Sequence, residues 1–324
     1  MKKMPKQIII ETSGVCQLKC KYCPTLSPDA KTGFMDMDLF KSIIDRVNFS
    51  TTVIPWMNGE PLLHPDYADM LDYIEEAGLR YYITTNGMIW RDDVFSTMLT
   101  GKGCYQAIFS LDGLPIDRSR SIELARPGTD RSKVLGTIKR FLDWKKEVNS
   151  DITVALKICH RGQDYEEIEN FIGYWLKQEG VDYVCVGKAL INDDNDKMRL
   201  YPCQYSENNF MVIRWDGQLV PCAYNDAAAN KHLINLGNID KKTPLLNIYN
   251  SPKYKAFRKV NTYPNFPKPC DTCGFAYTGT GFRGEINFRD KHITDKKVYY
   301  QQDYYNEFFS YKKSWKPDEY YLQR

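Results

Sequence analysis

Three cysteines near the start of the chain are spaced closely enough to bind one metal centre. Cys16, Cys20 and Cys23 are separated by three and then two residues, so a curled loop can bring their thiols together. A [4Fe–4S] cluster takes four ligands, so three protein thiolates leave one iron open for chemistry. A structural zinc site needs a closed set of four ligands, and no fourth Cys or His follows before His64. The spacing therefore allows a cluster with an open iron and leaves zinc as the alternative.

The composition favours metal or redox chemistry over disulfide bonds. The chain begins MKKMPKQIIIETS, without the apolar region of a secretory signal, so we expect a cytoplasmic, reducing environment in which disulfides are rare. Ten cysteines against four histidines in such a chain indicate metal binding. No apolar run is long enough for a transmembrane helix. A net charge of +3 gives no indication of nucleic-acid or membrane binding.

The stretch CQLKCKYC resembles the C-x3-C-x2-C signature of the radical S-adenosylmethionine (radical SAM) superfamily, including an aromatic residue, Tyr22, just before the third cysteine. By this resemblance the three thiolates bind a [4Fe–4S] cluster whose open iron is chelated by SAM, and Tyr22 lies near the adenine. The resemblance implies that an electron from the cluster cleaves SAM to methionine and a 5′-deoxyadenosyl radical. That radical then takes a hydrogen atom from the substrate.

The first two hundred residues alternate between the periodicities of strands and helices. The expected strands are 7–12, 51–56, 80–87, 104–113, 151–160 and 182–188, and the expected helices are 37–48, 65–78, 91–100, 131–147 and 164–179. Such alternation produces parallel strands joined by right-handed crossovers, hence an α/β sheet or barrel. Together with the resemblance, it predicts a partial (βα)6 TIM-like barrel over residues 1–200. Active sites of such folds lie at the carboxyl ends of the strands.

A turn after the second expected strand resembles a SAM-binding motif. Asn58, Gly59 and Glu60 belong to NGEP, which is similar to the family's GGEP, whose backbone carbonyls accept hydrogen bonds from the SAM amino group. Asn replaces the first glycine here, and Asn tolerates the positive φ that a glycine can adopt. By itself, the tetrapeptide is compatible with an ordinary turn.

Two polar residues at the end of the fourth expected strand and one beyond it are further candidates for binding SAM. Ser110 and Asp112 in SLDG resemble the strand end that contacts SAM, and Arg126 in ARPG resembles the arginine that meets its carboxylate. A guanidinium suits that role because its planar fork binds a carboxylate through two hydrogen bonds. The alternative for Arg126 is a solvated loop residue.

The fifth and sixth expected strands carry a cation and two thiols. Lys157 alternates with apolar neighbours, so it shares a face with Cys159, and a lysine inside a barrel needs a ligand or a carboxylate. We expect it to help hold SAM. Cys159 and Cys185 are either small buried hydrophobes or donors of a hydrogen atom to a substrate radical, as in epimerases of this superfamily.

A second cysteine set follows an irregular, charged stretch. By geometry alone, a zinc ion and an iron–sulfur cluster suit this set equally well; its members are Cys203, Cys222, Cys270 and Cys273. Their order after the barrel pattern resembles the SPASM/Twitch auxiliary-cluster domain, here expected over 201–290. A full SPASM domain carries further cysteines, and none follows Cys273. The resemblance therefore implies one [4Fe–4S] cluster held by these four residues.

Residues 291–324 are rich in tyrosine and carry no ligand spacing. We expect this segment to pack its aromatic side chains over the auxiliary domain. The alternative is a cap over the mouth of the barrel or a contact for a carbohydrate or a peptide.

The sequence thus predicts a radical SAM enzyme with two [4Fe–4S] clusters that oxidises a carbohydrate-like or other small alcohol, with the auxiliary cluster as electron acceptor. The alternative is modification or epimerisation of a ribosomally made peptide. Peptide-modifying members usually carry a peptide-binding module before the barrel, and the barrel here begins by residue 7, which favours the small substrate. We expect a flavodoxin- or ferredoxin-type reductant. A non-catalytic zinc-binding interaction protein is a more distant alternative.

Overall fold

The fold is organised by one twelve-stranded sheet that runs through the described part of the chain. The computed structural model describes residues 5–20, 23, 25, 31–114, 126–160, 165–188, 210–223, 234–260, 266, 268, 270, 282–288, 297–301 and 320–322. Its central strands are β1 (Gln7–Ile10), β2 (Thr52–Ile54), β3 (Tyr81–Thr85), β4 (Cys104–Ser110), β5 (Thr153–His160) and β6 (Tyr183–Lys188). These six strands are parallel and adjacent in chain order. The predicted alternation and the α/β fold class are therefore confirmed.

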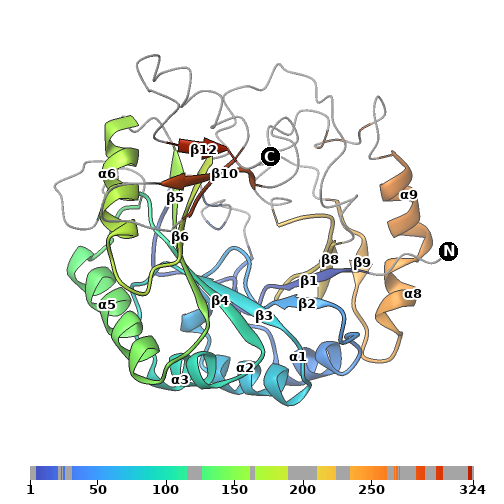
Figure 1. The fold of residues 1–324 in the computed structure, drawn as a ribbon. Helices are drawn as coiled ribbons and strands as arrows, with labels where there is room; N and C mark the ends of the chain where they lie inside the picture. The colour runs from blue at the N-terminus through green and yellow to red at the C-terminus, as the bar shows by residue number, and fades with distance from the viewer. Residues whose placement is uncertain are drawn as a thin grey trace.

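Helices cover the outer face of this curved sheet (Figure 1). They are α1 (Met37–Ile44), α2 (Tyr67–Glu76), α3 (Asp92–Thr100), α5 (Arg131–Glu147) and α6 (Tyr165–Leu176), with a short 3-10 helix η2 (Pro61–Leu63) before α2. The side chain of Asp36 caps the first helix by accepting a hydrogen bond from the backbone N–H of Leu39 at 3.0 Å. No helix in the described ranges is both long and apolar enough to cross a membrane.

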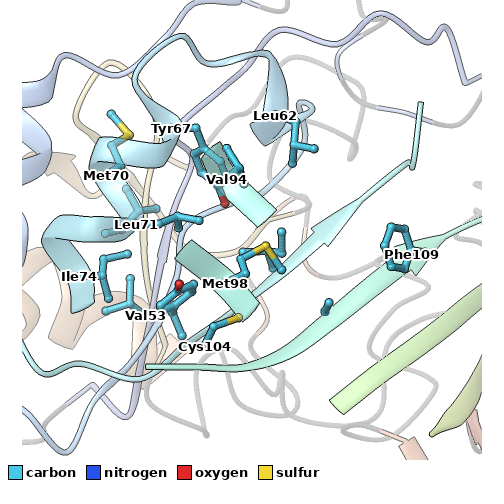
Figure 2. Close-up of a cluster of buried hydrophobic side chains, with 14 of the residues drawn as sticks. Val53, Leu62, Tyr67, Met70, Leu71, Ile74, Val94, Met98, Cys104 and Phe109 are labelled. Atoms are coloured by element: carbon cyan, nitrogen blue, oxygen red, sulfur yellow. The ribbon is translucent and has the colours of Figure 1, made fainter. Parts of the chain in front are cut away.

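The core lies between these helices and the sheet. In β3 the side chains of Tyr81 and Ile83 are fully buried, whereas Tyr82 between them is only half-buried, as the two-residue period of a strand requires. Figure 2 shows Met70, Leu71 and Ile74 of α2 beside Val53 of β2, in the same cluster as Met98 of α3 and Cys104 of β4. Each such apolar side chain contributes roughly 1.5–3 kcal/mol when fully buried. This packing fixes the strands whose ends carry the candidate site.

A second group of elements extends the sheet beyond β1. Strands β7 (Phe210–Ile213) and β8 (Gln218–Val220) form a hairpin, and Gly217 in its turn has a φ of +82°. Strand β7 pairs in parallel with β1, so the hairpin belongs to the same sheet as the barrel strands. Strand β9 (Gly237–Asn238) and helices α8 (Leu245–Tyr249) and α9 (Pro252–Val260) follow.

The described part of the tyrosine-rich segment extends the opposite edge of the sheet. Strand β11 (Lys297–Gln301) pairs in parallel with β6, and β10 (Phe282–Phe288) and β12 (Tyr320–Leu322) continue the sheet outward. We expected this segment to pack over the auxiliary domain, and β11 pairs with β10, which lies within the range 201–290 expected for that domain, as well as with the edge of the last barrel strand, β6. The physical reason is that an uncovered strand edge leaves a row of backbone donors and acceptors unpaired.

Candidate active site

The three N-terminal cysteines lie in a loop that leaves the carboxyl end of β1. The base of this loop is a narrow neck, in which the backbone N–H of Gly14 donates to the carbonyl of Gly33 at 2.8 Å and Ser13 bridges to Phe34. The next backbone contact, from the N–H of Met35 to the carbonyl of Thr12, is also 2.8 Å long. Tyr22, the predicted adenine contact, lies outside the described residues.

The cysteine side chains are close enough to affect one another electrostatically. Burial raises the pKa of the Cys16 thiol to about 12, although a backbone hydrogen bond at Leu18 lowers it, and the negative charges of Glu60, Cys20 and Cys23 raise it further. Cys20 is buried, and the backbone N–H of Cys23 donates to its carbonyl at 2.9 Å. Three thiolates gathered in this way need positive charge, which a coordinating metal supplies.

The NGEP turn packs directly against the start of the cysteine loop. A Cβ atom at Gly59 would lie 2.2 Å from the carbonyl oxygen of Ser13 and 2.7 Å from that of Val15, so only glycine fits. The carbonyl of Asn58 accepts a hydrogen bond from the Sγ of Cys23 at 3.8 Å. The turn therefore forms one wall of the cysteine site.

Asn58 occupies its position without the left-handed backbone that the sequence suggested. Asn149 is the only non-glycine residue with a positive φ in the described part of the chain, so the tolerance of Asn for positive φ is not needed here. The Nδ2 atom of Asn58 is buried and makes no hydrogen bond to the described protein groups. A buried amide donor in this state suits a site that binds a polar ligand.

Glu60 connects this turn to the end of β3. Its carboxylate accepts hydrogen bonds from the hydroxyl of Thr85 at 2.8 Å, the backbone N–H of Asn86 at 2.9 Å and that of Leu62 at 3.2 Å. Burial raises the pKa of Glu60 to about 7, even though these hydrogen bonds lower it. The side chain of Glu60 thus holds two strand ends together.

Asn86 is a site residue that the sequence reasoning missed. Its Oδ1 accepts from the backbone N–H of Met88 at 2.9 Å and from the Nε2 of Gln17 at 3.0 Å. Because a backbone N–H can only donate, the amide is oriented with its Nδ2 toward the Sγ of Cys16, 3.8 Å away. The TTNG motif at the end of the third strand contains Asn86 and could have identified it as a site residue.

Ser110, Asp112 and Arg126 lie together, with Asp112 and Arg126 buried and Ser110 half-buried. The guanidinium of Arg126 donates to the Asp112 carboxylate, to the Ser110 carbonyl and, at 3.0 Å, to the Ser110 hydroxyl. Arg126 is 8% exposed and Asp112 only 1% exposed, so the alternative of a solvated loop arginine is wrong. The guanidinium is therefore held by the protein before any ligand binds.

Lys157 and Cys185 continue from this group along the inner face of the sheet. Ser110, Lys157 and Cys185 are direct register partners across β4, β5 and β6, so their side chains share a face. Leu156 and Ile158 are fully buried on the other, helix-covered face. Cys185 is buried too, and the side chain of Cys159 lies outside the described residues. Lys157 thus lies on the face opposite the helices, as predicted.

Of the four predicted auxiliary ligands, the structure describes two. Cys222, just after β8, and Cys270 are both half-buried, and Cys203 and Cys273 lie outside the described residues. Among the residues that the structure describes, no three His, Cys, Asp or Glu side chains converge on one point as the ligands of a single ion do. Each thiolate of a cubane cluster binds a different iron, so a cluster site does not need that convergence.

Comparison with protein-family models decides the family. The model of the radical SAM superfamily matches residues 10–174, which is half of the chain. The chain belongs to the radical SAM superfamily. The model of SPASM, an iron–sulfur cluster-binding domain, matches residues 203–274. This radical SAM enzyme therefore binds SAM and a [4Fe–4S] cluster in its first domain and an auxiliary cluster in its second, and the zinc-binding interaction protein is excluded.

Relatives of this radical SAM enzyme align over most of its length. It is 25% identical over 317 residues to the tungsten-containing aldehyde ferredoxin oxidoreductase cofactor-modifying protein of Pyrococcus furiosus, with 83% of this chain and 87% of the relative covered. Its fold is similar to Streptococcus suis SuiB bound to precursor peptide SuiA, with a TM-score of 0.61, 18% identity, and 84% and 70% coverage of the two chains. It is also similar to anSMEcpe with bound AdoMet, with a TM-score of 0.61, 17% identity, and 95% and 93% coverage. At these identities the two solved structures establish the fold alone.

The observed residues fit the cofactors of the family. The clustered thiols, the tight wall at Gly59 and the buried amide of Asn58 together form a polar site that is suited to a cluster and a ligand. Arg126, held by Asp112, adds a fixed positive charge that suits a carboxylate.

Proposed function

We propose that this radical SAM enzyme oxidises an alcohol carbon in a small, carbohydrate-like or cofactor-like molecule. The observation that carries the proposal is the arrangement of three clustered thiols against the Asn58 carbonyl and the Asn86 amide, at the carboxyl ends of parallel strands. This is the end of such a sheet at which α/β enzymes place their chemistry.

The proposed ligands and contacts follow from the sequence motifs. Cys16, Cys20 and Cys23 hold the N-terminal cluster, Cys203, Cys222, Cys270 and Cys273 hold the auxiliary cluster, and SAM is bound by Tyr22, Asn58, Gly59, Glu60, Ser110, Asp112, Arg126 and Lys157. The fixed guanidinium of Arg126 orients the SAM carboxylate, and the turn at Gly59 orients its amino group.

The reaction removes two electrons and two protons from the carbinol group. When bound, SAM and the cluster held by Cys16, Cys20 and Cys23 would supply the one-electron chemistry that removes the carbinol hydrogen atom. The auxiliary cluster held by Cys203, Cys222, Cys270 and Cys273 would take up the remaining electron, and the hydroxyl proton would pass to solvent. The chain's own residues position the substrate and exclude water. The residues at the strand ends thereby hold the carbinol carbon of the substrate close to the radical that is derived from SAM.

The polar inner face of the barrel supports a hydroxylated substrate. Near the amino ends of the strands, the Nε2 of Gln106 on β4 donates to the hydroxyl of Tyr183 on β6, so the face opposite the helices is polar there. Ser110 and Lys157 lie further along the same face. Such hydrogen-bonding groups recognise hydroxyl groups better than apolar side chains do.

The Pyrococcus furiosus relative supports a small substrate. Its name describes modification of a cofactor, and the alignment covers most of this chain and most of the relative. Low-potential clusters and free thiols require reducing conditions, so we propose a cytoplasmic location and a flavodoxin- or ferredoxin-type electron donor.

A second candidate function rests on Cys185. This buried thiol lies beside Lys157 in the sheet register, where it suits donation of a hydrogen atom to a substrate radical. In that case the enzyme epimerises its substrate, for example a residue of a ribosomally made peptide, and Cys159 on the neighbouring strand is the other candidate donor.

Cleavage of SAM tests the proposed cluster site. The anaerobically reconstituted protein should form 5′-deoxyadenosine from SAM with dithionite, and Cys20→Ala should not. Cys104→Ala is the matched control, because it removes a buried thiol from the core beside α3 and should keep the activity. Retention of SAM cleavage in Cys20→Ala would exclude the assigned ligands.

Solvent deuterium separates the two reactions. Oxidation leaves no solvent deuterium at the reacting carbon and proceeds in Cys185→Ala and Cys159→Ala. Epimerisation in D2O places deuterium in the product and stops when the donor thiol is removed. Deuterium incorporation that depends on a thiol would therefore overturn the oxidation proposal.

A further inference from the structure

The turn of the β7–β8 hairpin contacts the neck of the cysteine loop, although the two are far apart in the sequence. Trp215 lies in this turn, and its indole Nε1 donates to the carbonyl of Lys31 at 3.2 Å, across 184 positions of the chain. Arg214 donates to the same carbonyl through Nη2 at 3.3 Å. The hairpin belongs to the SPASM match, whereas the neck belongs to the radical SAM match.

The indole ring of Trp215 packs closely against two glycines of the neck. A Cβ atom at Gly33 would lie 2.5 Å from Cζ3 of Trp215, and one at Gly14 would lie 2.8 Å from Cδ1. Neither glycine has a positive φ, so the backbone would accept alanine at both positions. The close approach of Trp215 is therefore what requires glycine.

A buried ion pair fixes the hairpin to the strand that leads into the loop. The Nε of Arg214 lies 3.6 Å from the Oε2 of Glu11, and both side chains are almost fully buried. The backbone N–H of Glu11 donates to the carbonyl of Ile213 at 2.8 Å, which extends the β1–β7 pairing as far as the loop. Removal of one partner from such a pair leaves a buried charge without its counterpart.

We propose that Trp215 and Arg214 are positioning residues that close the neck of the cysteine loop, so that the N-terminal cluster site is completed by the SPASM domain. Residues 15–32 carry the three cysteines between the two strands of the neck. Fixing the ends of this segment lowers the conformational entropy that is lost when three thiolates bind one cluster. The inference rests on the proposed assignment of Cys16, Cys20 and Cys23 as ligands.

The first test compares two cluster signals in the reduced, reconstituted full-length protein. SAM changes the electron paramagnetic resonance (EPR) signal of the cluster that it binds and leaves the auxiliary signal unchanged. Trp215→Ala should reduce the SAM-responsive signal by about 10- to 100-fold, the usual effect of removing a support around metal ligands. The auxiliary signal should persist. Trp144→Ala, which removes an indole from α5, is the control and should keep both signals.

The second test uses the glycine contact and does not depend on how Trp215→Ala folds. Gly33→Ala alone should disturb the neck and reduce the SAM-responsive signal to a similar extent. Combined with Trp215→Phe, which removes the ring atoms nearest to residue 33, the same Gly33→Ala change should have little further effect. Such non-additivity identifies a direct contact.

The outcomes separate the inference from the assignment of the ligands. If Cys20→Ala keeps the SAM-responsive signal, the ligands are wrongly assigned. If Cys20→Ala loses it while Trp215→Ala and Gly33→Ala keep it fully, the positioning role is wrong. An equal loss of both signals in Gly33→Ala also overturns the inference, because the effect should be confined to the N-terminal site.

Discussion

The side-chain amide of Asn86 points its Nδ2 at the Sγ of Cys16, 3.8 Å away. The contact is fixed from behind, because Met88 and Gln17 both donate to the Oδ1 of the same amide. A donor aimed at a ligand sulfur stabilises negative charge on that sulfur and on the cluster that it binds. With Cys16 as a proposed ligand, we expect the end of β3 to affect the reduction of the N-terminal cluster.

Replacing Asn86 should make the N-terminal cluster harder to reduce. In Asn86→Ala the midpoint potential should become more negative, because the reduced cluster loses a hydrogen-bond donor, and SAM cleavage should fall by about 10- to 100-fold. An EPR-monitored redox titration measures the potential. Asn48→Ala, at an exposed position near the opposite ends of the strands, is the control. An unchanged potential in Asn86→Ala would show that the amide does not act on the cluster.

Gly59→Ala should damage the site by steric conflict. The added methyl group meets the backbone carbonyls of Ser13 and Val15, which cannot rotate away as a side chain can. We expect a loss of about 1–3 kcal/mol in the free energy of unfolding, the usual cost of overpacking, together with weaker SAM binding. Denaturant unfolding and equilibrium dialysis measure the two effects.

Gly136→Ala is the matched control for Gly59→Ala. Gly136 lies exposed on α5, and its added methyl group meets no atom within 4 Å. Alanine in a helix interior should raise the free energy of unfolding by about 0.5–1 kcal/mol. Equal effects at both positions would contradict the steric explanation.

Arg126→Ala should destabilise the fold as well as weaken SAM binding. It leaves the buried Asp112 carboxylate without the guanidinium that neutralises it, which typically costs about 3–5 kcal/mol. Asp112→Asn introduced into Arg126→Ala should recover part of this loss, because the buried group is then neutral. Thermal unfolding of Arg126→Ala, Asp112→Asn and the double variant measures the coupling. Strictly additive effects would contradict the ion pair.

We expect the buried imidazole of His64 to make the fold less stable in mild acid. Its Nδ1 accepts from the backbone N–H of Asp66 at 3.1 Å, so its Nε2 carries the proton and donates to the carbonyl of Met35 at 2.9 Å. Burial lowers the pKa of His64 below the usual 6.5. The imidazole is therefore protonated more readily in the unfolded chain than in the folded chain. As a result, the free energy of unfolding falls as the pH drops below about 6.5.

The melting temperature of the cluster-free protein between pH 5 and 7.5 tests this effect. His64→Gln keeps an amide donor for Met35 and removes the titrating group, so its melting temperature should depend less on pH than that of the wild type. An identical pH dependence in the two proteins would exclude His64 as the cause.

The local features of this protein could be predicted from residues near one another in the chain. The spacing of Cys16, Cys20 and Cys23 and the alternating periodicities of residues 7–188 gave the cluster motif and the parallel sheet, because ligand spacing and side-chain period are local properties. The cap at Asp36 and the turn at Gly217 were predictable for the same reason.

The contacts that complete the site depend on which distant segments meet. Trp215 packs on Gly14 and Gly33 only because β7 pairs with β1, and no periodicity in either segment specifies that partner. Likewise, Asn86 meets Cys16 because the strands that precede them, β3 and β1, are both neighbours of β2 in the sheet. The sequence alone predicted the ligands and determined the fold class, whereas the tertiary structure decided which side chains surround the predicted ligands, because long-range pairing depends on the packing of the whole chain.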